Sequence, residues 1–327
     1  MTVLVTGGAG YIGSHTVRKL RERGEDVIVF DSLRTGFRQA AGDTPVVVGD
    51  VTDPRTLARL FKKHEIASVV HFAARKSVGE SMAAPADYFH INVGGTSNLL
   101  DAAHQAGVRH VVFSSSCSVY GTPDHLPVNE QAALRPESVY AQTKLMCEQM
   151  LQWYSSCHDV RSVSLRYFNA AGASLDSTLG EDWTECHNLI PLVMKATLRH
   201  RGPIDVFGTD YPTPDGTAIR DYIHVDDLAN GHLRALDYLR SGGSTVSLNL
   251  GTGTGSSVQQ VIDAAERAAN MDCPRRYVER RAGDPVALWS DNERITQTLG
   301  WTPEYGLDEI VQTAWNWHFR NQTGFAG

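Results

Sequence analysis

Tyr140 and Lys144 stand four residues apart in the stretch 138–149. On a helix this spacing places two side chains on one face, with their Cβ atoms roughly 5–6 Å apart. An ammonium held near a phenol favours the phenolate and lowers the phenol pKa from its usual value of about 10. A tyrosine tuned in this way can act as a base near neutral pH. The same pair also occurs on ordinary solvated helix faces, so the rest of the chain has to decide between these interpretations.

A glycine-rich turn close to the N-terminus lies between an expected strand and an expected helix. The apolar run 3–5 leads into Gly7, Gly10 and Gly13, and a helical pattern follows as far as Gly24. In this context Gly7 allows the tight turn, Gly10 lets the backbone approach a pyrophosphate, and Gly13 lets the helix pack close to the strand. The spacing is one residue longer than the commoner dinucleotide fingerprint. The helix N-terminus would offer unpaired N–H groups to the phosphates.

Two carboxylates follow the next two expected strands. Asp31 ends the strand 27–30 and lies 18 residues after Gly13, near the offset of a carboxylate that binds the adenosine ribose. A carboxylate there repels a 2′-phosphate and favours NAD over NADP, although Arg34 nearby keeps this choice open. Asp50 follows the strand 46–48 and is placed to bind the adenine amino group. It could equally cap the helix that starts near Pro54.

Strands and helices alternate through the first half of the chain. Further strands are expected over 69–72, 111–113 and 163–165, with helices over 57–63 and 88–105. This alternation predicts an α/β fold with a doubly wound parallel Rossmann sheet, in which ligands lie at the carboxyl ends of the strands. We expect residues 1–168 to form this NAD-binding domain and 223–250 to return to it, with a strand over 246–250.

The remainder, 169–327, has longer loops rich in Gly, Pro, Asp and Thr and is expected to form a smaller α/β substrate domain. Helices are expected over 225–239, 258–269, 295–299 and 307–317, the last three on the substrate side.

Composition narrows the function classes. The chain has 327 residues, 42% of them hydrophobic and 20% charged, which is typical of a globular protein. A net charge of -7 argues against nucleic acid or an anionic membrane as partner, and no run of about 18 apolar residues predicts a membrane helix. Five cysteines without a Cys-x-x-Cys pair favour a reducing, cytoplasmic location. The histidines show no metal-binding spacing, so no metal is expected.

Ser116 completes a possible catalytic group. It ends the run 114–116 after the expected strand 111–113, at the edge where a cofactor would lie. Beside a nicotinamide, Ser116 could hold the substrate oxygen or pass a proton along. Tyr140 would abstract that proton, and Lys144 would set the pKa of the phenol while holding the cofactor ribose.

Motifs spread over most of the chain carry a resemblance to a known family. They lie at 7–15, 71–73, 76–81, 92–96, 114–116, 119–121, 140–144, 166–172, 188–191, 208–216, 220–225 and 281–284. In this order they resemble the extended short-chain dehydrogenase/reductase family, and within it the branch that inverts C4′ of UDP-hexoses. The glycine motif alone would be weak evidence, but the joint occurrence is highly specific.

The resemblance implies site residues and partners. In addition to the three glycines, it implies NAD contacts at Tyr11, Ile12, Asp31, Asp50, Val51, Phe72, Lys76, Asn92, Tyr140, Lys144 and Phe168. It implies a UDP-sugar site at Lys76, Ser116, Tyr140, Asn169, Asn188, Leu189, Phe207, Arg220, Arg281, Asp284 and Leu288. The two arginines suit a pyrophosphate, and Phe207 can stack on uracil. A homodimer through the helices around 88–105 and 140–154 is also implied.

The implied reaction interconverts UDP-glucose and UDP-galactose through a 4-keto sugar, by hydride transfer from C4′ to NAD and return to the other face. Leu288 falls where several members have a tyrosine over the hexose C2 substituent. The smaller side chain predicts that N-acetylated UDP-hexoses are also accepted.

Three alternatives were weighed. An epimerase of UDP-pentoses would share nearly all the motifs. A 4,6-dehydratase would carry an Asp-Glu pair where Cys117 and Ser118 stand. An NAD-sensing regulator would usually lack the tyrosine or the lysine, and both are present.

Overall fold

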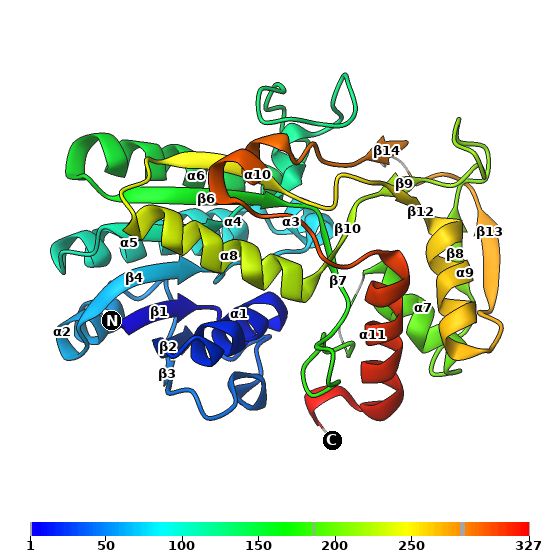
Figure 1. The fold of residues 1–327 in the computed structure, drawn as a ribbon, viewed down its shortest axis with the longest axis horizontal. Coiled ribbons are helices and arrows are strands. Elements are labelled where there is room, and N and C mark those ends of the chain that lie inside the picture. The colour runs from blue at the N-terminus through cyan, green and yellow to red at the C-terminus, as the bar shows by residue number, and fades with distance from the viewer. Residues whose placement is uncertain (1, 185, 187, 282–284, 327) are drawn as a thin grey trace.

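Seven parallel strands form the central sheet, in the order β11-β6-β5-β4-β1-β2-β3 (Figure 1). The computed structural model describes residues 2–184, 186, 188–281 and 285–326. The strands are β1 (Thr2–Thr6), β2 (Asp26–Asp31), β3 (Val46–Val48), β4 (Ile66–His71), β5 (His110–Ser114), β6 (Arg161–Tyr167) and β11 (Val246–Leu250). The chain builds outward from β1 to β3 and then returns to β4 on the other side of β1. This reversal creates the crevice at which such sheets bind ligands.

Helices cover both faces of the sheet. Along β1 the side chains alternate, so that Val3 and Val5 belong to one buried cluster and Leu4 to another. The first cluster includes residues of α1 (Tyr11–Glu22), α8 (Val225–Arg240) and α10 (Glu293–Leu299). The second includes residues of α2 (Pro54–Lys63), α5 (Gly95–Gln105) and α6 (Val139–His158). The predicted doubly wound α/β fold is therefore confirmed, and 246–250 does return to the sheet.

Short elements lie between these helices and strands. They are η1 (Arg38–Ala41), α3 (Val78–Ala83), α4 (Pro85–Tyr88), the π-helix η2 (Phe89–Gly94) and η3 (Cys117–Tyr120). Thus the helix expected over 88–105 is an α-helix from Gly95, preceded by α4 and η2.

The position of α10 differs from the expectation. It was placed on the substrate side, but Ile295 and Leu299 belong to the same buried cluster as Val3. The reason is an apolar face that packs on α8 and β11. Sequence order alone could not show which part of the molecule this helix would cover.

A second buried core lies on the other side of the molecule, among α7 (Leu189–Thr197), α9 (Val258–Ala269) and α11 (Leu307–Arg320) (Figure 1). Small sheets accompany these helices. β7 (Asn169–Ala171) pairs with β10 (Tyr222–His224), and β8 (Ile204–Phe207) pairs with β13 (Arg275–Val278). β9 (Ile219–Arg220) lies between β12 (Ser256–Ser257) and β14 (Ala287–Leu288), and η4 (Gly324–Ala326) follows α11. The division of the chain at residue 168 stays a prediction.

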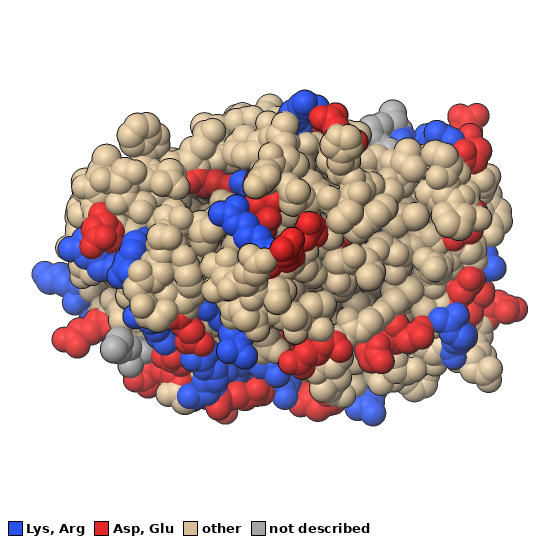
Figure 2. All heavy atoms as spheres, turned by 45° about the horizontal axis from the view of Figure 1, so that its top comes forward, with Lys and Arg blue, Asp and Glu red and all other residues tan. Residues whose placement is uncertain are grey.

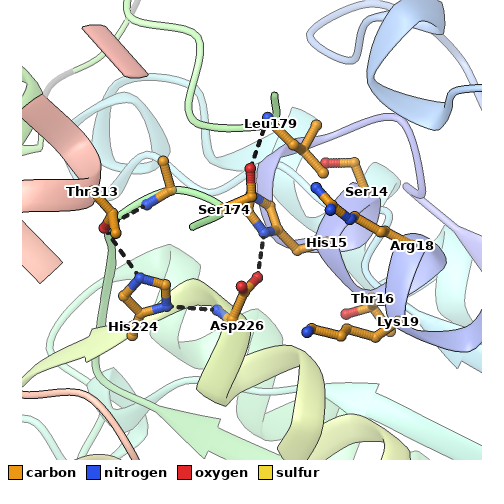
Figure 3. A network of polar contacts seen from close by, with 12 residues as sticks. Ser14, His15, Thr16, Arg18, Lys19, Ser174, Leu179, His224, Asp226 and Thr313 are labelled. Carbon is orange, nitrogen blue, oxygen red and sulfur yellow. Dashed lines mark hydrogen bonds and ion pairs between the residues drawn. The ribbon is translucent and has the colours of Figure 1, made fainter. Parts of the chain in front are cut away.

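A buried polar network joins the two parts (Figure 3). The Nδ1 atom of His15 on α1 lies 2.7 Å from Oδ1 of Asp226, and the Asp226 amide donates to Nδ1 of His224 at 3.1 Å. The Nε2 atom of His224 lies 3.1 Å from Oγ1 of Thr313 on α11. Burial lowers the pKa of both histidines. The helix that follows the glycine loop is therefore connected, through β10 and the start of α8, to a helix of the second core.

Charged side chains of both signs lie beside one another on the face shown in Figure 2, rather than forming a broad field of one sign. Among the helices of the described residues, none is both long and apolar enough to cross a membrane.

Candidate active site

The glycine loop packs so closely on the chain's own backbone that Gly7 and Gly13 have no space for a side chain. Gly7 has a φ of +71°, and a Cβ there would lie 2.6 Å from the Ala73 nitrogen. A Cβ at Gly13 would lie 2.2 Å from the Gly7 oxygen. Gly10 is the N-cap of α1 and supplies no side-chain cap for the first N–H groups of the helix. This backbone cradle, open at a helix N-terminus, fits the pyrophosphate of a dinucleotide.

Asp31 lies at the end of β2, directly beside this loop. Its carboxylate accepts hydrogen bonds from the Ala9 amide at 3.0 Å and the Leu33 amide at 2.9 Å. These bonds leave lone pairs on both oxygens, because a carboxylate can accept about four. Asp31 can therefore hold the loop in place and still accept hydrogen bonds from ribose hydroxyls.

Asp50 does not cap α2. The N-cap is Asp53, which accepts from the Arg55 amide at 2.9 Å, while Asp50 accepts from the Thr52 amide and hydroxyl. The capping alternative for Asp50 is therefore wrong. Arg34, which kept NADP open as a cofactor, has its Nη2 atom 3.5 Å from Oδ2 of Asp50. The cation that kept NADP open therefore already faces a carboxylate.

Tyr140 and Lys144 lie together on α6, as their spacing predicts. Ser138 caps the helix by accepting from the Ala141 amide at 3.1 Å, which places Tyr140 in the first turn. The Lys144 ammonium lies 5.8 Å from the centroid of the Tyr140 ring and donates to the Ser114 carbonyl at 2.7 Å. Both side chains are buried. The bond to Ser114 holds the ammonium at the carboxyl end of β5.

Ser116 lies at the same place, as the N-cap of η3 just after β5. Its Oγ atom accepts from the Ser118 amide at 3.2 Å and lies 2.9 Å from the Ser118 hydroxyl. A hydrogen bond with Ser116 lowers the pKa of the Tyr140 phenol. The three residues predicted to form a Ser–Tyr–Lys group are therefore neighbours in the fold.

The expected lowering of the Tyr140 pKa is wrong for the protein alone. Burial raises the pKa of Tyr140 above its ordinary value and outweighs the lowering by the Ser116 hydrogen bond. Burial also lowers the pKa of Lys144 to about 8, although Cys147 and Glu148 act in the opposite direction. Charging a phenol inside the protein is costly, and helical spacing carries no information about burial.

A buried ion pair to which the motifs gave no role joins α6 to β6. Arg166 donates to Glu148 at 2.6 Å, and both side chains are only 6% exposed. Glu148 also accepts a hydrogen bond from Ser115, next to Ser116. A signal existed in the sequence, because Glu148 follows Lys144 by four residues and therefore shares the buried face of α6. The pair connects α6, the end of β5 and β6.

Asn92 serves a similar purpose on the cofactor side. Its side-chain oxygen accepts from the Arg75 amide at 2.8 Å, and its nitrogen donates to the Arg75 carbonyl and to the Thr143 hydroxyl at 3.0 Å. Asn92 therefore fastens the segment after β4 to α6.

Other residues predicted to contact NAD form apolar surroundings. Phe72 packs against His232, with ring centroids 4.6 Å apart. Val51 belongs to the core beside β1, and its carbonyl accepts a hydrogen bond from the Asn98 side chain at 3.2 Å. Tyr11 donates from its hydroxyl to the Gly172 carbonyl at 2.7 Å, and Ile12 packs against the first core.

Leu288 lies in an apolar cluster with residues close in sequence to Ser116, Tyr140 and Lys144. Its partners include Phe168, Val119 beside Ser116, and Leu145 beside Lys144. In β14, Leu288 is paired with Arg220 of β9. The fold therefore brings together the predicted specificity residue, a predicted phosphate ligand and α6.

The residues of the predicted UDP site come from strands, from the start of α7 and from loops. The Arg281 guanidinium lies 4.3 Å from the centroid of Phe207, at the end of β8. Lys76 and Asn188 both contact Glu181, at 3.4 Å and 2.9 Å. Glu181 is a buried carboxylate that the motifs did not assign. Asn169 begins β7 with an exposed side chain, Leu189 begins α7, and Asp284 lies outside the described residues.

These features define a class of protein: a dinucleotide-binding α/β protein with a tyrosine, a lysine and a serine at the ligand edge of its sheet. The chain belongs to the NAD dependent epimerase/dehydratase family, whose pattern matches residues 3–251. The resemblance drawn from the motifs is thereby confirmed.

The similar proteins have consistent names. A protein named UDP-glucose 4-epimerase from Rhizobium meliloti (strain 1021) is 46% identical over 323 residues, which are 98% of each chain. A crystal structure of UDP-glucose 4-epimerase from Brucella ovis in complex with NAD is 43% identical, with a TM-score of 0.94 and coverage of 96% and 97%. The UDP-Glc/GlcNAc 4-epimerase from Campylobacter jejuni is 36% identical, with a TM-score of 0.87 and coverage of 98% and 99%.

Proposed function

We propose that this chain interconverts UDP-glucose and UDP-galactose by inverting C4′, with NAD as a bound cofactor. The observation that carries the proposal is the placement of Ser116, Tyr140 and Lys144 at the ligand edge of a dinucleotide-binding sheet. The 46% identity to a protein named UDP-glucose 4-epimerase supports the same conclusion.

The residues that would hold NAD fit its chemical groups. The loop from Gly7 to Gly13 would hold the pyrophosphate, Asp31 the adenosine ribose and Asp50 the adenine amino group. Lys144 would donate to the second ribose. When bound, NAD⁺ supplies a cationic ring that accepts a hydride from C4′ and returns it to the opposite face of the 4-keto sugar.

Tyr140 is the proposed base. Its phenolate takes the proton from the 4′-hydroxyl, directly or through Ser116, and returns a proton to the other epimer. Burial raises the pKa of Tyr140 in the protein alone, so the phenolate needs positive charge close by. Lys144 provides such a charge from the same helix.

The UDP part of the substrate would be held more firmly than the sugar. Arg220 and Arg281 would bind the pyrophosphate, and Phe207 would pack against the uracil. A firm hold on this remote group keeps the intermediate in place while the hexose turns over and presents its other face.

Leu288 is the proposed determinant of substrate range. Leu288 belongs to the same apolar cluster as Phe168. Its side chain is smaller than the tyrosine found in several members of the branch. We infer that UDP-hexoses with a 2-acetamido group are also substrates. The similarity to a UDP-Glc/GlcNAc 4-epimerase agrees with this inference. Use of UDP-pentoses, a homodimer and a cytoplasmic location stay predictions.

The test is to incubate the protein with UDP-galactose and to follow UDP-glucose with a coupled dehydrogenase. Tyr140→Phe should abolish turnover and spare NAD binding. Tyr154→Phe, on the same helix but packed in the core, is the matched control and should remain active. Full activity of Tyr140→Phe would contradict its role as the base, and no turnover by the unaltered protein would contradict the function.

A further inference from the structure

The segment after α11 folds back onto the loop that follows Gly180. The Phe325 amide donates to Oδ2 of Asp182 at 2.9 Å. Gly324 has a φ of +65°, and a Cβ there would lie 2.1 Å from the same carboxylate oxygen. A glycine is therefore required for the chain to approach Asp182 this closely.

Phe325 lies between two aromatic rings from different parts of the chain. Its ring stacks on Phe37, with centroids 5.3 Å apart and planes 28° apart. It also contacts Trp317 of α11, with centroids 5.2 Å apart. Trp317 is itself buried and donates from its ring nitrogen to the Glu181 carbonyl at 2.9 Å. Phe325 is therefore positioned by α11 and by the 181–182 loop together.

Phe37 belongs to the loop that borders the proposed adenosine site. Its amide donates to the Ala9 carbonyl, within the glycine loop, at 2.9 Å. A Cβ on Gly36 would lie 3.0 Å from both the Ala9 carbonyl carbon and Oδ1 of Asp31. The loop 33–37 thus lies directly against the groups that would hold the pyrophosphate and the adenosine ribose.

The contact between Phe325 and Asp182 connects the segment 321–326 to the predicted substrate site. Asp182, which binds the Phe325 amide, follows Glu181, whose carboxylate contacts Lys76 and Asn188. The segment 321–326 is therefore attached to both edges of the active site, through Phe37 on one side and Asp182 on the other.

We propose that Phe325 is a positioning residue that holds the loop 33–37 over the cofactor cradle and so slows the loss of NAD. This inference rests on the proposed binding of NAD. If release requires the loop 33–37 to move away from Ala9, it must also separate the Phe37 and Phe325 rings. Loss of one such aromatic contact, and of the apolar area it buries, corresponds to a release rate about tenfold higher.

The experiment measures NAD release from Phe325→Ala. Protein loaded with NAD is freed of excess cofactor, and the NAD that appears in filtrates is followed over time. Phe319→Ala is the matched control, because Phe319 is 54% exposed and contacts Trp315 instead. We expect about tenfold faster release from Phe325→Ala and unchanged release from Phe319→Ala. The kcat of both variants should be unchanged when NAD is saturating. Release from Phe325→Ala at the rate of the unaltered protein would overturn the proposal.

A double-mutant cycle tests whether the effect passes through Phe37. Phe37→Ala alone should accelerate release about as much as Phe325→Ala, and the two together should add little more. Fully additive effects would overturn the proposed route. If Phe325→Ala does not fold, Phe325→Leu keeps apolar volume but removes the ring; faster release supports the proposal, and unchanged release overturns it.

The proposed function can fail separately. Unaltered protein that binds NAD but does not epimerise UDP-galactose would overturn the function and leave the release measurements valid. Unaltered protein that binds no NAD would overturn both.

Discussion

Replacing Lys144 by methionine removes the ammonium next to Tyr140 while retaining most of the side-chain volume. The ammonium lies 5.8 Å from the Tyr140 ring centroid. With the ring centroid taken as the centre of the phenolate charge, the two unit charges interact by about 3 kcal/mol at an effective dielectric constant of about 20. This interaction corresponds to a shift of about 2 pKa units. We therefore expect the phenol of Tyr140 to become harder to ionise in Lys144→Met, and kcat at pH 7 to fall about 100-fold.

The sign of the pH dependence follows from the base role of Tyr140. The rate rises with pH while the phenol ionises, so Lys144→Met should move this rising limb upward by about 2 pH units. Burial lowers the pKa of Lys144 to about 8. The ammonium is therefore present below this pH and is lost as the pH rises through it. The difference between the two proteins should be largest below about pH 8.

The assay is the coupled conversion of UDP-galactose, measured from pH 6 to 10 at saturating NAD. Bound NAD is quantified as well, because Lys144 is also predicted to contact the NAD ribose. Lys195→Met is a suitable control, because Lys195 is a cation of α7 that lies near Trp183. An unchanged pH profile and an unchanged kcat at pH 7 in Lys144→Met would contradict the role of the ammonium in ionising Tyr140.

Four further substitutions separate the roles of individual residues. Leu288→Tyr should lower kcat/KM for UDP-GalNAc at least tenfold and change that for UDP-galactose much less; no turnover of UDP-GalNAc by the unaltered protein would contradict the inference. Arg166→Met should lower the free energy of unfolding by about 3–5 kcal/mol, measured in urea, because it leaves Glu148 charged and buried without its partner; a loss below about 1 kcal/mol, as for an exposed pair, would be inconsistent with this. Asp50→Ala should weaken NAD binding with little change in stability. Asp53→Ala should remove the cap of α2, costing about 1 kcal/mol and sparing NAD, and the reverse result for the two aspartates would show that their roles are exchanged.

Much of the dinucleotide site could be predicted because its signals are local. The order of strand, glycines and helix around Gly7 and Gly13 predicts a turn independently of the rest of the chain. Asp31 is predicted in the same way, because it ends the next strand. Asp50 and Asp53 show where this local reasoning ends. Both precede the same helix, and which of them is the cap depends on the residue at which the helix begins, where sequence patterns are least precise.

The pairing of Tyr140 with Lys144 follows from the sequence alone, because a helix of 3.6 residues per turn brings residues four apart onto one face. The pKa values of the two side chains, by contrast, depend on the tertiary structure. Burial, a property of the whole fold, raises the pKa of Tyr140 and lowers that of Lys144. Contacts across long stretches of chain also belong to the fold alone, such as Leu288 against Phe168 and Phe325 against Phe37. These contacts depend on which faces of distant elements pack together, and periodicity within one element carries no information about its partners.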